Sequence, residues 1–130
     1  MQNNTKLLEL KELLAVQSEL ELVILVGSQA HGNANQDSDW DFAIRWIEYL
    51  EPMQQLAKTE RLRRLLAKQL LQTDVNIDLI DLCRATLAMR AVVAEEGLIL
   101  KGEESLAWAH FLQRTWRDLE GFYWNKIYAA

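Results

Sequence analysis

The sequence has little of several residue types and patterns, and each shortage excludes a class of protein. It holds one cysteine, Cys83, so no internal disulfide can form and a reducing compartment fits. No apolar run approaches the ~20 residues of a membrane-spanning helix, and residues 1–14 lack the pattern of a signal peptide. Lys and Arg are outnumbered by Asp and Glu, leaving a net charge of −5, which argues against general nucleic-acid binding. We therefore expect a cytoplasmic protein without direct membrane or nucleic-acid contacts.

The chain is long enough for one domain with a real core. It has 130 residues, half of them hydrophobic, and shows no linker, repeat or low-complexity tract. We expect a single domain over residues 1–130. A separate substrate-binding domain would not fit within this length.

Two carboxylates follow a buried strand at short distance. The apolar run 22–26 predicts a strand over 21–27 that ends at Gly27 and Ser28, and Asp39 and Asp41 open a second strand over 39–47. Residues two apart in a strand share a face, so the two carboxylates point together and repel unless a cation lies between them. A hard divalent ion such as Mg²⁺ takes such oxygen ligands. The opposite face carries residues expected in the core, namely Trp40, Phe42, Ile44 and Trp46.

The turn before these carboxylates suits an anion. Gly27 allows close approach to the backbone, and Ser28 suits the N-cap of a short helix whose free N–H groups face a phosphate. A phosphate cradle beside a carboxylate pair favours metal-assisted phosphoryl or nucleotidyl transfer. The alternative is a polar loop in which Asp37, Ser38 and Asp39 only cap a turn.

Gly27-Ser28, ten residues, and then Asp39-Trp40-Asp41 carry a specific resemblance. This pattern resembles the GSx10DxD signature of the DNA polymerase β-like nucleotidyltransferases. Residues 27–42 are most similar to the minimal nucleotidyltransferases, many of which are antitoxins encoded beside a HEPN-domain ribonuclease toxin.

A third carboxylate lies in the predicted strand over 74–81. Asp78 is a charge in the middle of that strand, where a carboxylate needs a reason. The resemblance places the family's third acidic residue at this position. The alternative is an edge-strand residue that faces water. Asp74 and Asp81, at the strand ends, are expected to be turn residues.

The remaining pattern alternates helices with strands. Helices are expected over residues 5–19, 53–71, 84–96 and 103–127, with a short helical turn and loop over 29–38 and a short strand over 98–100. This order predicts an α/β or α+β domain. The resemblance implies the polymerase β-like nucleotidyltransferase fold, with a small mixed sheet of about four strands, flanking helices and a long C-terminal helix.

Several other features keep two interpretations each. Arg61, Arg64 and Lys68 form a basic stripe that could meet a triphosphate or an acidic partner, or be a solvated helix face. The aromatic residues within 108–128 are either core or a partner interface. We expect His31 to have a structural or phosphate-adjacent role and His110 to pack in the fold or at an interface. Cys83 is expected to be a small core residue.

The resemblance also implies an activity and a partner. Asp39, Asp41 and Asp78 would hold Mg²⁺, with Asp78 alternatively taking the acceptor's proton, while Gly27 and Ser28 would anchor the phosphates of ATP. AMP would pass to a hydroxyl, expected to be a tyrosine of a partner HEPN toxin in a hetero-oligomer. Two alternatives remain: an antitoxin that only occludes the toxin, and the catalytic subunit of a small-molecule nucleotidyltransferase.

Overall fold

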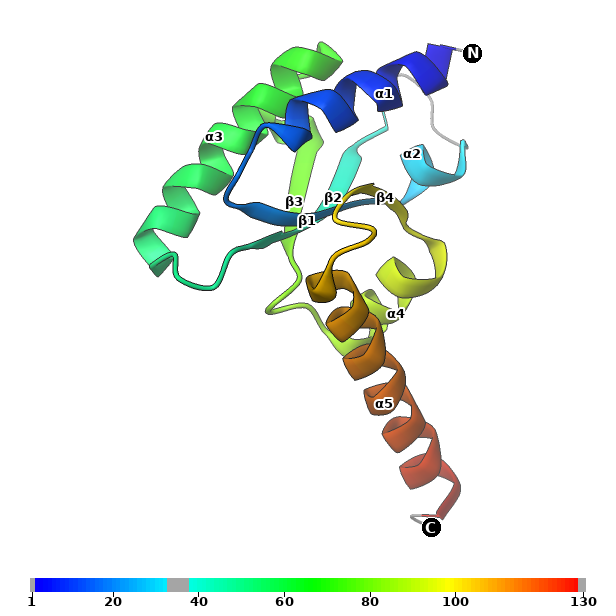
Figure 1. Ribbon diagram of the computed structural model, residues 1–130. Helices are drawn as coiled ribbons and strands as arrows, with labels where there is room; N and C mark the ends of the chain where they lie inside the picture. The colour runs from blue at the N-terminus through cyan, green and yellow to red at the C-terminus, as the bar shows by residue number, and fades with distance from the viewer. Residues whose placement is uncertain (1, 33–37, 129–130) are drawn as a thin grey trace.

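The computed structural model describes residues 2–32 and 38–128, so Asp37 of the turn-capping alternative lies outside the described residues. The elements follow one another as α1 (Gln2–Ala15), β1 (Leu20–Val26), α2 (Ser28–His31), β2 (Trp40–Trp46), α3 (Pro52–Leu70), a 3-10 turn η1 (Asp74–Asn76), β3 (Ile77–Asp81), α4 (Leu87–Glu96), β4 (Leu98–Lys101) and α5 (Leu106–Tyr128) (Figure 1).

A four-stranded mixed sheet in the order β3-β2-β1-β4 forms the centre of the fold. Strand β1 runs antiparallel to both β2 and β4, whereas β2 and β3 are parallel. A parallel pair needs a crossover, and α3 supplies it. The predicted mixed sheet, flanking helices and long C-terminal helix are therefore confirmed.

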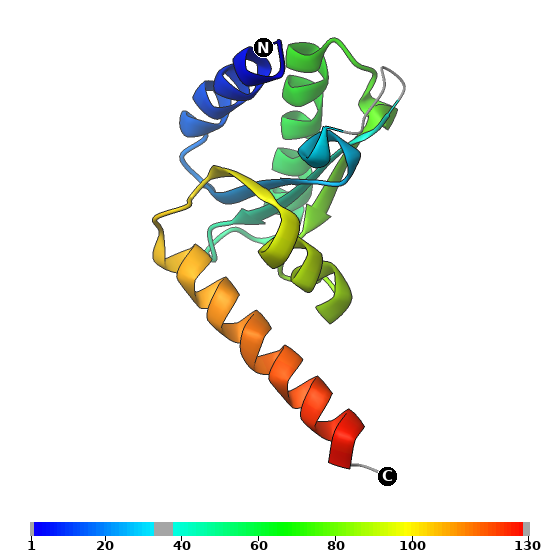
Figure 2. The ribbon, with the colours of Figure 1, turned by 90° about the vertical axis from the view of Figure 1, so that its right-hand side faces the viewer.

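Helices cover both faces of the sheet. Phe42 and Ile44 of β2 join Leu66 of α3 in one buried cluster, to which α1 also contributes. Ala43, the residue between them, joins a second cluster with Val93 of α4 and Phe111 of α5. The sheet thus lies between an α1/α3 layer and an α4/α5 layer (Figure 2). Side-chain alternation along β2 decides which layer each residue meets.

Several helix boundaries differ from the sequence expectation. Helix α1 begins at Gln2 and ends at Ala15, because residues 16–19 form the turn into β1. Helix α4 begins only at Leu87, where the Thr86 side chain accepts a hydrogen bond from the backbone N–H of Met89. Helix α5 likewise begins at Leu106, after the Ser105 hydroxyl has accepted from the Trp108 backbone N–H.

Two local expectations were wrong. The strand predicted over 74–81 starts only at Ile77, because residues 74–76 form a 3-10 turn in which Val75 is 86% exposed. Cys83 is exposed and not a core residue. Partial burial and the nearby Asp81 raise the pKa of its thiol, which keeps the thiol protonated and a poor nucleophile.

Helix α3 offers a matched test of the core, because Leu56 on this helix is 57% exposed. Leu66, on the same helix, is fully buried. Leu66→Ala is expected to lower the free energy of unfolding by about 2–5 kcal/mol through lost burial and a new cavity. Leu56→Ala should change it by no more than about 0.5 kcal/mol. Urea denaturation of both variants measures the difference, and equal losses would contradict the α1/α3 layer described here.

Helix α5 belongs to the fold over only part of its length. Trp108, Phe111 and Thr115 are buried, whereas every residue from Glu120 to Tyr128 is exposed. In both views the helix extends away from the rest of the domain (Figures 1 and 2). Among the described helices, none combines the length and apolarity needed to cross a membrane.

Candidate active site

The turn between β1 and α2 brings backbone directly under a carboxylate. Gly27 has φ +79°, in the left-handed region that favours glycine, and it caps α2. A Cβ atom at Gly27 would lie 2.7 Å from Oδ2 of Asp41. Ser28 is the first residue of α2 and not its N-cap, and no side chain caps this helix. The group that closely approaches the Gly27 backbone is thus the Asp41 carboxylate, and the approach of a phosphate stays a prediction.

The sheet register brings the predicted acidic residues together. Asp41 of β2 lies opposite Asp78 of the parallel strand β3. It also lies opposite Val26, the last residue of β1, which places it beside the Gly27-Ser28 turn. Asp39 comes just before β2 and is exposed. All five predicted site residues therefore meet at one end of the sheet.

Like charges crowd Asp41. Burial raises the pKa of this carboxyl, and the charges of Asp78 and then Asp39 raise it further. Asp78 itself is exposed on β3, which is an edge strand, as the alternative interpretation supposed. Because Asp78 lies opposite Asp41, its charge nevertheless raises the pKa of the Asp41 carboxyl. A cation, or a proton, would relieve this repulsion.

Two further residues hold the site, and the sequence analysis did not single them out. Nε2 of Gln29 in α2 donates to the backbone carbonyl of Ser38 at 3.3 Å, which ties the residue before Asp39 to the Gly27 turn. Nη1 of Arg63 in α3 donates to the carbonyl of Ile77, the residue before Asp78. Gln29 could have been noticed as a polar residue in the ten-residue spacer. Arg63 could not, because its partner is a backbone atom 14 residues away.

The donor set fits an open Mg²⁺ site better than a closed one. Within residues 2–32 and 38–128, no group of three or more His, Cys, Asp or Glu side chains is placed to enclose a metal ion. In phosphate-binding sites Mg²⁺ is usually held by one or two carboxylates, with substrate phosphates completing its shell. Asp41 with Asp39 supplies such a pair, and the crowding at Asp41 shows that uncompensated negative charge is concentrated there.

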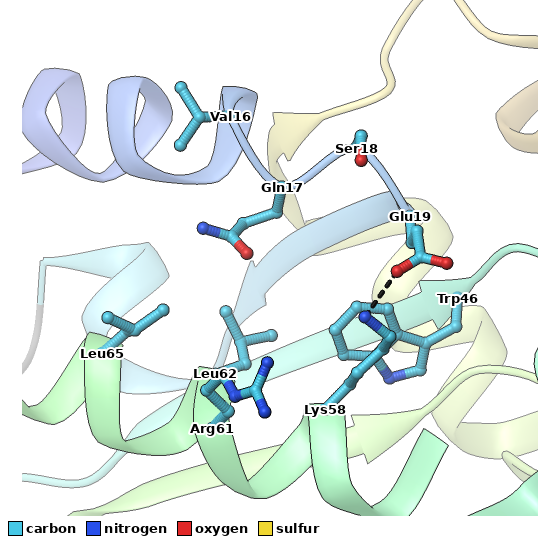
Figure 3. Close-up of a pocket in the computed structure, with 9 residues that line it drawn as sticks. All are labelled: Val16, Gln17, Ser18, Glu19, Trp46, Lys58, Arg61, Leu62 and Leu65. Carbon is cyan, nitrogen blue, oxygen red and sulfur yellow. Dashed lines mark ion pairs between the residues drawn. The ribbon is translucent and has the colours of Figure 1, made fainter. Parts of the chain in front are cut away.

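The basic stripe of α3 lies in the other layer. Arg61, Arg64 and Lys68 are exposed on a helix that packs on the α1/α3 face, whereas Asp41 shares its face with Ala43 and the α4/α5 layer. Arg61 lines a cavity of about 160 Å³ between α3 and the α1–β1 turn, where Lys58 pairs with Glu19 (Figure 3). This geometry does not bring the stripe to a nucleotide held at Asp41.

Neither histidine joins the acidic group. Nε2 of His31, in α2, lies 3.9 Å from Oε2 of Glu96, and both side chains are exposed. His110 is exposed on α5 and lines a cavity of about 510 Å³ with Arg45 and Arg114. The site is thus built from carboxylates and backbone.

The comparisons with known proteins agree with this geometry. The family described as "Polymerase beta, Nucleotidyltransferase" matches residues 9–105. No curated protein matches the sequence.

Solved toxin–antitoxin structures share the fold. One, with AMP-PNP, is 24% identical with a TM-score of 0.66 and covers 94% of this chain and 90% of that one. A mutant of the MntA–HpeT toxin–antitoxin is 26% identical with a TM-score of 0.64 and coverages of 92% and 87%. A structure of a tri-AMPylated Shewanella oneidensis HEPN toxin in complex with MNT antitoxin is 21% identical, with a TM-score of 0.62, and covers 90% of this chain and 88% of that one.

Proposed function

Because this chain belongs to the polymerase beta nucleotidyltransferase family, we propose that it transfers AMP from ATP to a tyrosine hydroxyl of a HEPN toxin and acts as that toxin's antitoxin. One observation carries the proposal. Asp41 lies opposite Asp78 and against the backbone of Gly27, and the charge of Asp39 helps to raise its pKa. Nucleotidyl transfer needs carboxylates that would hold Mg²⁺ and, beside them, backbone N–H groups that bind the phosphates.

In the proposed reaction the acceptor oxygen forms a bond to the α-phosphorus of ATP, and the bond from that phosphorus to the β-phosphate oxygen breaks. Pyrophosphate leaves with its electron pair. Gly27 and Ser28 hold the β- and γ-phosphates, through backbone N–H groups and the serine hydroxyl. Asp78 lies on the acceptor side of Asp41 and takes the hydroxyl proton.

Asp39 and Asp41 are the residues that would hold Mg²⁺. When bound, the ion supplies charge neutralisation at the phosphates and the leaving pyrophosphate. Without a cation the two carboxylates would repel the triphosphate, so their position decides where the ion, and with it the phosphates, would lie. Gln29 keeps Asp39 near the phosphate turn through its bond to Ser38.

The acceptor is inferred from what surrounds the site. The described part of the chain is built around one sheet, and the carboxylates lie at an end of that sheet, with Asp78 exposed on its edge strand. Such an open site fits an acceptor that brings its own structure, as a protein does. The AMPylated toxin held by the Shewanella oneidensis antitoxin, which has this fold, supports a HEPN toxin as that protein. AMP on a tyrosine would add bulk and negative charge near a ribonuclease site and so exclude RNA.

The direct test is mass spectrometry of intact chains. The protein is incubated with ATP, Mg²⁺ and the product of the adjacent gene, which the proposal expects to be a HEPN-domain protein. One or more AMP units should appear on the partner, and none when ATP is replaced by α,β-methylene-ATP, whose α–β bridge cannot be cleaved, or when Asp39→Asn is used. Peptide mapping then identifies the modified residue, expected to be tyrosine.

Other outcomes lead elsewhere. A toxin that is silenced in a stable complex without gaining mass would contradict AMP transfer and favour an occluding antitoxin. Incorporation of AMP into small hydroxyl compounds, with none on the toxin, would favour a small-molecule nucleotidyltransferase.

A further inference from the structure

The end of α5 is an apolar surface that this chain leaves uncovered. Five side chains there are 53–69% exposed: Phe122, Tyr123, Trp124, Ile127 and Tyr128. Residues 121–128 carry a single charged side chain, Lys126. Low charge and high aromatic content characterise the centres of protein interfaces. We call residues 119–128 the α5 tip.

The apolar residues of the α5 tip cover about two thirds of the helix circumference, and Asn125 lies on the remaining side. Phe122, Tyr123 and Trp124 are consecutive, so their side chains project in directions about 100° apart. Rings pack along the helix as well, since Trp124 and Tyr128 have centroids 4.2 Å apart. A helix that is apolar over most of its circumference is normally buried over most of it. One partner helix would cover one side only, so the occupant must present several helices or a deep groove.

The available area suits a specific complex. An aromatic side chain buries roughly 150–250 Å² when covered, so the exposed fractions of these five side chains amount to roughly 600–700 Å². A standard interface buries roughly 800 Å² on each partner. The α5 tip could therefore supply most of one side of such an interface.

Gly121 provides a separate indication of close contact. Glycine inside a helix is unfavourable relative to alanine, and a Cβ atom at Gly121 would meet none of the residues that the structure describes within 4 Å. The fold of the chain alone therefore gives no steric reason for glycine here. A partner backbone lying against the helix would give one.

The extent of the two kinds of match shows which partner fits. The family match ends at residue 105, immediately before α5 begins at Leu106. Residues 1–105 are about four fifths of the chain, so toxin–antitoxin structures that cover 92–94% of it must align with part of α5. The helix is therefore an addition to the family's core that antitoxins solved with their toxins share.

We propose that the α5 tip inserts between helices of the HEPN toxin and is the anchor of the complex. This inference rests on the proposed function for the identity of the partner. Helix α5 packs on the same layer of the sheet that Asp41 faces. A toxin held by the tip therefore approaches the domain from the side on which the carboxylates lie, which would favour transfer to a residue of that same toxin.

Calorimetry measures the affinity of the product of the adjacent gene, expected to be a HEPN-domain protein, for two forms of this chain. These are the wild type and the double variant Trp124→Ser/Ile127→Ser. We expect the double variant to weaken binding at least about tenfold, as loss of central aromatic anchors does. Leu106→Ser, which alters another exposed apolar residue of α5 outside the tip (75% exposed), should bind like the wild type. Gly121→Leu should also weaken binding, because it fills the space left for the partner. Circular dichroism and melting temperature verify that each variant folds.

Wild-type affinity in the double variant would overturn the inference. So would a failure of the wild type to bind the toxin, or a dimer of this chain that depends on the tip and persists with toxin present. Asp39→Asn separates this inference from the proposed function: if it and the wild type bind through the tip but neither transfers AMP, the docking surface stands and the proposed reaction fails.

Discussion

Asp41→Asn should lower the rate of AMP transfer by about 10²–10⁴-fold, since a metal-assisted site supplies several kcal/mol of stabilisation to the phosphate charge. Asp39→Asn should act in the same direction. Pyrophosphate release measured with ATP, Mg²⁺ and the HEPN toxin gives the rate. Both variants at wild-type rates would show that these carboxylates are not the reactive centre.

The same variants should remain folded, which separates loss of chemistry from loss of structure. Burial and the charges of Asp78 and Asp39 raise the pKa of Asp41, so its charge destabilises the folded state above that pKa. The folded state loses this destabilisation as the pH falls through the raised pKa, because the carboxyl is then protonated. In EDTA at neutral pH, Asp41→Asn should therefore melt at or above the wild-type temperature. Mg²⁺ with AMP-PNP should raise the melting temperature of the wild type more than that of the variant.

Gly27→Ala should abolish most of the transfer activity at a modest cost in stability. The new Cβ would lie 2.7 Å from Oδ2 of Asp41, closer than non-bonded atoms approach, so the carboxylate must move. A shift of about 1 Å in a reacting constellation can cost about 10²-fold in rate. Initial rates at saturating and limiting ATP should show a lower kcat and a higher KM for ATP, because ATP binds more weakly.

Gly32→Ala is the matched control for that variant. Gly32 also has a positive φ, +73°, so alanine there meets a similar backbone strain of about 1 kcal/mol. Among the described residues nothing lies within 4 Å of its Cβ position, so no described acidic residue would be displaced. Both variants should lose similar stability, and only Gly27→Ala should lose activity. Equal activity losses would mean that backbone strain, and not the Asp41 contact, explains the effect.

Much of the fold could be predicted from patterns along the chain. The alternation along 39–47 correctly predicted that Trp40, Phe42 and Ile44 share one buried face of a strand, because side-chain direction in a strand depends only on position. Apolar spacing located α3 and α5 for the same reason. Boundaries were less predictable where local polar contacts decide them, as at Thr86, which delays the start of α4.

The acidic site was predictable in its members and not in its arrangement. Gly27 and Asp41 stand out by their spacing, and Asp78 by a charge within an apolar strand. That Asp78 lies opposite Asp41 depends on the parallel register of β2 and β3, which joins segments 37 residues apart. Pairing at that separation follows from the packing of α3 across the sheet, which no local pattern records.

The sequence by itself determined the strands, the principal helices and the residue types of the site, because these depend on periodicity and on chemistry carried by short segments. Only the tertiary structure decided that Asp41 rests against Gly27, that the α3 stripe lies in the other layer, and that the α5 tip leaves the domain. The aromatic residues of 108–128 show why: a helical pattern predicts an apolar face at every turn. How much of that face is covered depends on where the sheet beneath it ends.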